Sequence, residues 1–194
     1  MTLTTHTPPA QGRRWLSITT KSVLAVLCLM MAAMWVYYFF FASDQGVYQL
    51  SDASWRTTAK PICEAAQAER AALADTEGGY IENPTVEQMV QRADIVDSAT
   101  NIIERMLDDI MAIPVATDRD RALLKVFDEN YRIIIGDRRR YAAQLRAGNL
   151  VAYSETVVAG GPVSNVVLDF TAGVKGNDVP SCSPPGELGG DIRT

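Results

Sequence analysis

The hydrophobic pattern divides the chain into one uncharged apolar stretch and a longer region of helical periodicity. Residues 22–42 carry no charged side chain, and about 20 helical residues span the roughly 30 Å hydrocarbon core of a bilayer. Trp35, Tyr37 and Tyr38 lie toward the C-terminal end of the stretch, where aromatic rings favour the membrane interface. The pattern therefore predicts a transmembrane helix over 22–42.

A buried core helix and a cleaved signal peptide are the alternatives for this stretch. Core helices of this length usually carry a charge. A signal peptide has a shorter apolar region, of about 7–15 residues, which ends at a small-x-small site. Here the stretch ends with three phenylalanines and Ala42, so we interpret it as an uncleaved signal anchor.

The charge distribution predicts the orientation of that anchor. Three of the 18 basic residues precede residue 22, and all 23 acidic residues follow it. The positive-inside rule therefore predicts a cytoplasmic tail over 1–21 and an extracytoplasmic C-terminal part in the cell membrane. Beyond the stretch the formal charge is 15 − 23 = −8, which excludes nucleic acid as an expected partner.

Beyond a polar stem over 43–53, apolar residues recur every three or four positions, which is typical of amphipathic helices. Pro61 suits a first helical position, so the main part of the first helix is expected to begin at Lys60. The apolar stripe expected on the third helix includes Ala122, Val126 and Phe127. The helices are predicted over residues 54–74, 85–113, 118–146 and, more weakly, 154–172.

Local signals support these bounds. Thr85 and Gln88 have the spacing of a capping box, and Asp118 is expected to cap the third helix. Gly160-Gly161-Pro162 interrupts the last segment, which is therefore predicted as one or two short helices. The fold class is all-α: a transmembrane helix followed by an extracytoplasmic antiparallel bundle of three or four helices over 54–172. The tail over 173–194 is expected to be irregular.

Cys63 and Cys182 are the two cysteines outside the apolar stretch. Such a pair in an oxidising compartment predicts a disulfide bond. The alternative is a pair of free thiols or a redox site, which the absence of a Cys-x-x-Cys spacing disfavours. The bridge would join the first helix to the C-terminal tail.

The chemical equipment of the outer region is sparse. The single histidine, His6, lies in the predicted cytoplasmic tail, so no His-based triad and no common zinc site is expected outside. The carboxylates that could act as acid and base or bind calcium are instead expected to lie on solvated helix faces; they are Glu104, Asp108, Asp109, Asp118 and Asp120. We therefore expect neither catalysis nor a metal or other cofactor.

Three successive arginines follow Asp137, and they point to different sides of a helix. If the second and third helices fold back near residue 115, two positions lie at the same height along the helices when their residue numbers add up to about 230. This predicts a partly buried pair between Asp94 and Arg138, with Asp97 as the alternate partner. Arg139 and Arg140 remain as candidates for an interaction or an anion site.

The chain resembles a family of uncharacterised actinobacterial envelope proteins. The resemblance is carried by Cys63, by the pattern Asp-Arg-x-x-Tyr-Ala-x-x-Leu-x-x-Gly over 137–148, and by Cys182 with the prolines that follow it. It covers roughly residues 55–185 and implies an N-terminal anchor before a helical domain. It assigns no activity to the chain. The region around 160–162 departs from the pattern.

These observations predict a membrane-anchored structural or interaction protein. In one version it is an accessory subunit of an envelope or membrane complex, with another membrane or envelope protein as its partner. The alternative is a module that binds an apolar ligand or lipid between the helices, lined by Met89, Met106 and Met111.

Overall fold

The computed structural model describes residues 12–41, 46–73 and 83–186. The chain forms two compact units, Met1–Asp44 and Gln45–Thr194, which we describe separately. The described chain is mostly helical, as predicted, and its strands form one sheet of two very short strands.

The first unit contains helix α1, Gly12–Phe41. Its segment Lys21–Tyr38 is long and apolar enough to cross a membrane, and the side chains of this segment are exposed. The helix begins well before residue 22, the predicted start, because basic and polar residues before the apolar stretch are also compatible with helix. Residues 1–11 of the predicted tail and residue 42 lie outside the described chain.

Helix α2, Ala53–Ala72, runs without a break through Pro61, so the predicted start of the main helix at Lys60 is wrong. The Asp52 carboxylate caps the helix and accepts a hydrogen bond from the Ser54 amide at 2.8 Å. Packing of one buried stripe that continues on both sides of the proline stabilises the helix as a whole. This stripe consists of Trp55, Ala59, Cys63 and Ala66.

Helices α3, Val86–Met111, and α4, Asp118–Arg146, lie close to their predicted bounds. The predicted capping box is confirmed. The Gln88 amide donates to the Thr85 hydroxyl at 3.3 Å, and the Thr85 amide donates to the Gln88 side chain at 2.8 Å. Helix α4 is capped by Thr117, one residue earlier than predicted.

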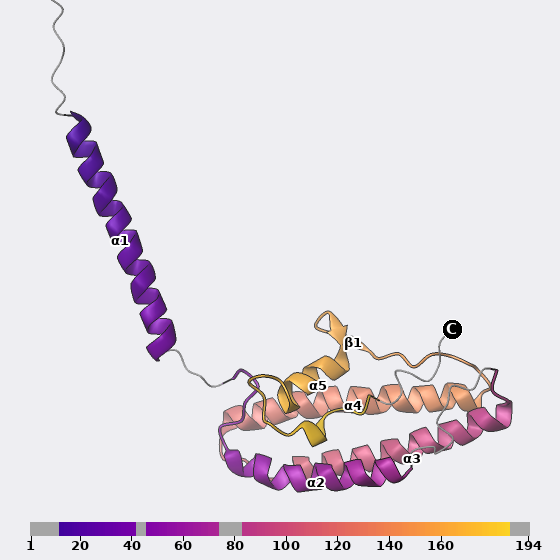
Figure 1. The fold of residues 1–194 in the computed structure, drawn as a ribbon. Helices are drawn as coiled ribbons and strands as arrows, with labels where there is room; N and C mark the ends of the chain where they lie inside the picture. Colours follow the sequence, from indigo (N-terminus) through magenta and orange to yellow (C-terminus); the bar gives the residue numbers. More distant parts are fainter. Residues whose placement is uncertain (1–11, 42–45, 74–82, 187–194) are drawn as a thin grey trace, which may run out of the picture. The chain divides into compact units, whose positions relative to one another are not determined.

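Figure 1 shows α2, α3 and α4 lying lengthwise beside one another. Asp94 of α3 pairs with Arg146 of α4 at 2.7 Å, and Asp108 of α3 pairs with Arg132 of α4 at 2.9 Å. Since the residue numbers rise on one helix as they fall on the other, α3 and α4 are antiparallel.

The buried stripe of α4 differs from the prediction. Ala122 and Val126 are exposed, and Leu124 is buried between them in sequence. The reason is a regular alternation of four and three positions along the inner face, which excludes both residues. This inner face consists of Asp120, Leu124, Phe127, Tyr131, Ile134, Arg138, Tyr141 and Leu145. Two of its members are charged.

The region predicted as a weak helix from 154 begins as a hairpin. Strands β1, Val157–Val158, and β2, Gly161–Pro162, pair in antiparallel register. Between them Ala159 and Gly160 have φ angles of 52° and 85°, and such a two-residue turn with positive φ at both positions matches the twist of a hairpin. Helix α5, Val163–Thr171, follows directly, so the helical prediction holds for its second half.

The C-terminal segment is ordered farther than predicted. A 3-10 turn, η1, covers Pro180–Cys182 and packs against α2 and α5. The predicted disulfide is confirmed, with Cys63 bonded to Cys182 at 2.04 Å. Both half-cystines are fully buried, so the bridge fastens the end of the domain to its first helix. Residues 187–194 of the predicted tail lie outside the described chain.

The core consists of two apolar clusters. The larger one joins all the domain's α-helices and η1 around an aromatic centre, in which the Phe170 ring stacks on Phe127 at 4.4 Å and meets Trp55 edge-on at 5.9 Å. The smaller one lies between the N-terminal half of α3 and the C-terminal half of α4. Met106 belongs to the larger cluster and Met89 to the smaller, and Met111 packs against the larger one as a partly buried residue.

Candidate functional site

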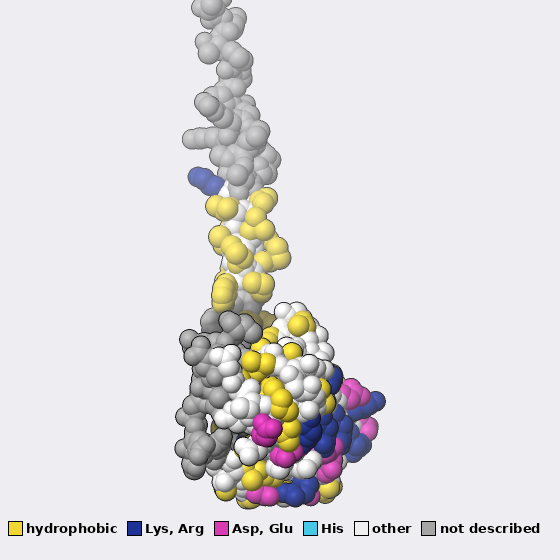
Figure 2. Space-filling view, turned by 90° about the vertical axis from the view of Figure 1, so that its right-hand side faces the viewer, with side chains coloured by type: hydrophobic (Ala, Val, Ile, Leu, Met, Phe, Trp, Pro, Cys, Tyr) yellow, Lys and Arg dark blue, Asp and Glu magenta, His cyan; other side chains and the backbone are white. Residues whose placement is uncertain are grey.

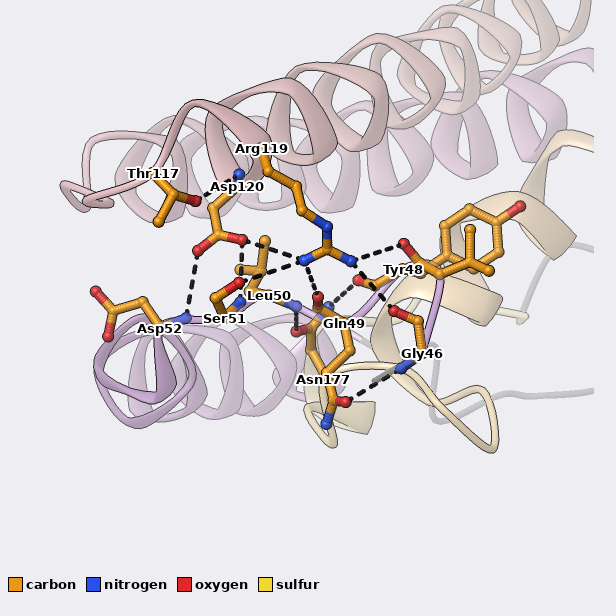
Figure 3. A network of polar contacts seen from close by, with 11 residues as sticks. Gly46, Tyr48, Gln49, Leu50, Ser51, Asp52, Thr117, Arg119, Asp120 and Asn177 are labelled. Carbon is orange, nitrogen blue, oxygen red and sulfur yellow. Dashed lines mark hydrogen bonds and ion pairs between the residues drawn. The ribbon is translucent and has the colours of Figure 1, made fainter. Parts of the chain in front are cut away.

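The segment that enters the domain from the anchor is packed rather than a free stem. Leu50 is 2% exposed and belongs to the larger apolar cluster. Its amide donates to the Asn177 side chain at 2.9 Å. Figure 3 shows that polar side chains from α4 and from the loop after α5 bond to residues of the segment 46–52. The part of the predicted stem that the structure describes therefore belongs to the domain.

Arg119, in the first turn of α4, binds backbone carbonyls of this segment. Its guanidinium donates to the carbonyl oxygens of Gln49 at 2.9 Å, Gly46 at 3.3 Å and Val47 at 3.4 Å. A planar group with five N–H donors can serve several acceptors at once. Arg119 thus gathers three carbonyls of one turn onto the end of a helix.

Asp120 binds the amides that follow. Its carboxylate accepts hydrogen bonds from the amides of Ser51 at 3.0 Å and Asp52 at 3.3 Å. The side chain is fully buried and also lies 3.6 Å from the Arg119 guanidinium. A carboxylate in the first turn of a helix is favoured by the helix dipole, so the same charge stabilises α4 and the entering chain.

Asn177 completes the arrangement. Its side-chain amide donates to the carbonyl oxygens of Tyr48 and Phe170, both at 3.0 Å, while its oxygen accepts from Leu50. It therefore joins the entering segment to the end of α5. We refer to Arg119, Asp120 and Asn177 together as the stem clasp.

The stem clasp was not predicted, although part of its signal is present in the sequence. The sequence pattern predicts Asp120 on a solvated helix face, like Asp118. However, Asp120 occupies a position of the inner stripe of α4, and both of its oxygens accept amide hydrogen bonds. Asp118 is 98% exposed at the side chain and pairs with Arg121. The two carboxylates thus have separate roles.

The structure places the two residues of the predicted pair, Asp94 and Arg138, in different surroundings. Asp94 and the alternate residue Asp97 both pair with Arg146, whereas Arg138 is 1% exposed and donates to the Thr100 hydroxyl at 3.1 Å. For pairs of residues that contact each other between α3 and α4, such as Asp94 and Arg146, the two residue numbers add up to about 240 rather than 230. The reason is that side chains lean toward the N-terminus of their own helix, which shifts contacts between antiparallel helices in this direction.

The other two arginines also meet partners within the chain. Arg139 donates to Asn101 at 3.2 Å and pairs with Glu104. Arg140 donates to the Thr156 hydroxyl at 3.2 Å and pairs with Asp137. On the face shown in Figure 2, basic and acidic side chains lie intermixed rather than in a patch of one sign. Pairing of this kind leaves Arg139 and Arg140 with less capacity for an external anion.

A buried polar layer lies between the two apolar clusters. It consists of Thr100 on α3 and Asp137 and Arg138 on α4. Thr156, which follows α4, is exposed and bonds to this layer from its edge. The amide and hydroxyl of Thr156 donate to Asp137 at 2.7 and 2.8 Å. Of the two residues of the predicted pair, Arg138 belongs to this layer, whereas Asp94 is exposed.

Tyr153 packs beside this layer. Its ring lies 5.7 Å from that of Tyr141, edge to face. Burial, followed by the charge of Glu155, raises the pKa of Tyr153 to about 12. The phenol is therefore protonated over the physiological pH range.

The remaining carboxylates proposed for chemistry lie on helix surfaces. Glu104 pairs with Arg139, and Asp108 pairs with Arg132. Within residues 21–38, 46–73 and 83–186, no group of three or more His, Cys, Asp or Glu side chains is arranged to bind a metal ion.

Comparison with known proteins gives no relative. No family model, no curated protein and no solved structure matches the chain. The resemblance to actinobacterial envelope proteins therefore stays a prediction, and the proposal for function depends on the geometry.

Proposed function

We propose that the protein is a membrane-anchored, extracytoplasmic interaction protein that acts as an accessory subunit of a membrane or envelope complex. Helix α1 is its anchor, with the N-terminus in the cytoplasm and the helical domain outside. The observation that carries the proposal is the stem clasp. It joins the entering segment 46–52 to the folded core. Such a fixed connection suits a domain that binds a partner in one orientation.

The orientation follows from charge and from the disulfide. Basic residues precede the apolar part of α1 and acidic residues follow it, which favours retention of the N-terminus inside. The bond between Cys63 and Cys182 is of a kind that persists in oxidising compartments outside the cytoplasm. Both observations support the same orientation.

The finer architecture supports a role in binding rather than chemistry. We treat α2, α3 and α4 as a three-helix bundle on which α5 and η1 are fastened by aromatic packing and the disulfide. The charged residues first considered for catalysis, such as Asp120 and Glu104, have partners within the chain. A rigid body with its charges paired is suited to offering a surface to another protein.

The test is purification of the tagged protein from its native membranes in mild detergent, followed by mass spectrometry of the retained proteins. We expect one stoichiometric partner, which retains this chain when the partner itself carries the tag. The variant Asp120→Ala, which opens the stem clasp, should retain less partner. The variant Asp118→Ala, which changes an exposed carboxylate two residues earlier, should retain the normal amount. A solitary protein in every purification would refute the accessory-subunit proposal.

A further inference from the structure

The domain begins at a residue that is closely enclosed. Gly46 is buried, and a Cβ atom on it would lie 2.0 Å from the Lys175 carbonyl oxygen. Arg119 donates to the Gly46 carbonyl at 3.3 Å. The first described residue of the domain is therefore held against the loop that follows α5, so this loop and the entering chain form one end of the domain.

Apolar side chains point to solvent on both sides of this contact. Val47 is 77% exposed and Val174 is 105% exposed, which are the two highest values among the large hydrophobic residues of the domain. Tyr48 is 37% exposed, and its carbonyl is bound by Asn177 (Figure 3). The backbone that carries these side chains is thus bonded in place while the side chains themselves remain uncovered.

The charges at this end are mixed. Lys175, which follows Val174 in the sequence, is exposed, and Arg119 is partly exposed. Asp169 on α5 and Asp178 on the loop after it carry exposed carboxylates. This end of the domain thus carries two cations, two anions and exposed valines. Such a surface suits a zwitterionic, partly apolar environment better than it suits water or a polyanion.

The covalent chain limits where this end can be. Residues 42–45 separate the end of α1 from Gly46. Five peptide steps span at most about 18 Å when fully extended, while the headgroup layers make up the difference between about 30 Å and 40–45 Å of bilayer thickness. Because Gly46 is held in the domain, the distance limit that applies to Gly46 also applies to this end of the domain.

We propose that this end of the domain lies in the headgroup layer of the membrane that α1 crosses, with Val47 and Val174 inserted among the lipids. Lys175 then extends its aliphatic stem along the interface and its ammonium toward lipid phosphates. The contact prevents free rotation of the domain about its short connection. This inference rests on the proposed membrane anchor, and it adds a lipid-contacting surface to the domain.

The test uses the full chain in phosphatidylcholine vesicles. Cys28, the one free cysteine of the described chain, is replaced by alanine, and the buried disulfide is left oxidised. Single cysteines are introduced as Val47→Cys and Val174→Cys and labelled with an environment-sensitive fluorophore. The matched control is Val86→Cys. Val86 is also exposed, at 54%. It is the first residue of α3, whose 26 residues make the helix about 39 Å long.

We expect lipids with a quencher near the headgroup to quench the labels at positions 47 and 174 and to leave the label at 86 unquenched. Adding Val174→Asp should reduce quenching at 47, and adding Val86→Asp should not. Equal quenching at 174 and 86 in protein that resists alkaline extraction would overturn the membrane contact alone. Extraction of the protein by alkali would overturn the membrane anchor, and the contact with it.

Discussion

Replacing Asp120 by alanine tests whether the entering chain is an integral part of the domain. The substitution removes the acceptor for the amides of Ser51 and Asp52, which lie at 3.0 and 3.3 Å. It leaves the cap of α4 in place, because the Thr117 hydroxyl accepts from the backbone amide of residue 120 at 3.0 Å. The main loss is therefore the pair of hydrogen bonds to the entering chain.

Hydrogen bonds to an ionised group contribute about 1.5–3 kcal/mol each. The two amides lie near the surface and can bind water after the substitution, so we expect the free energy of unfolding to fall by about 2–4 kcal/mol. The matched control is Asp118→Ala, which removes a carboxylate from the same helical turn. Asp118 is 98% exposed at the side chain, so its removal affects only screened interactions and should cost much less.

Urea unfolding of the full chain in detergent, followed by the fluorescence of the buried Trp55, measures both variants. Amide hydrogen exchange at Leu50 and Ser51 provides the local readout. In Asp120→Ala these amides should exchange faster than in the control, while the aromatic core keeps its protection. Equal stabilities of the two variants, or unchanged exchange at these amides, would refute the stem clasp as a stabilising device.

Three further predictions concern other parts of the domain. Joint replacement of Cys63 and Cys182 by serine should lower the free energy of unfolding by up to about 5 kcal/mol, because the bond closes a loop with a sequence separation of 119; thermal unfolding of the variant beside the native chain measures the loss. Asp137→Ala should cost about 2–4 kcal/mol, since it removes the acceptor for two donors of Thr156; urea unfolding checks this, and a neutral effect would contradict the polar layer. Between pH 10 and about 12 the folded chain keeps the Tyr153 proton that the unfolded chain releases, so stability should fall as pH rises through this window. The difference in phenolate absorbance between the native chain and Tyr153→Phe should show a last titration step near the upper limit.

Much of the helical fold follows from local signals. The capping box at Thr85 and Gln88 and the glycine after α4 lie within a few residues of the ends that they mark, so the sequence alone locates those ends. The continuity of α2 through Pro61 could not be predicted in this way. It depends on burial of Trp55 and Cys63 on either side of the proline, which is a tertiary effect that outweighs a local propensity.

The stem clasp shows why candidate sites are harder to predict. Its contacts join residues far apart in the sequence, and many of the acceptors and donors are backbone groups that every residue possesses. Leu50 and Asn177, for example, are separated by 127 positions. The disulfide was predictable because cysteine pairs are chemically distinctive. The partner of Asp94 was not, because it depends on the direction in which long side chains lean.

The Cys63–Cys182 bond also has a consequence for a domain exposed to proteases. It closes the chain from Cys63 on α2 to Cys182 in η1, which includes α3, α4 and α5, into a covalent ring. One backbone cleavage anywhere inside the ring leaves both fragments covalently joined to α1, so a nicked molecule keeps its connection to the proposed anchor. Cleavage between α1 and Cys63 instead separates the domain from α1. The packing of residues 46–52 against the core therefore protects part of the segment in which a single cut would release the domain.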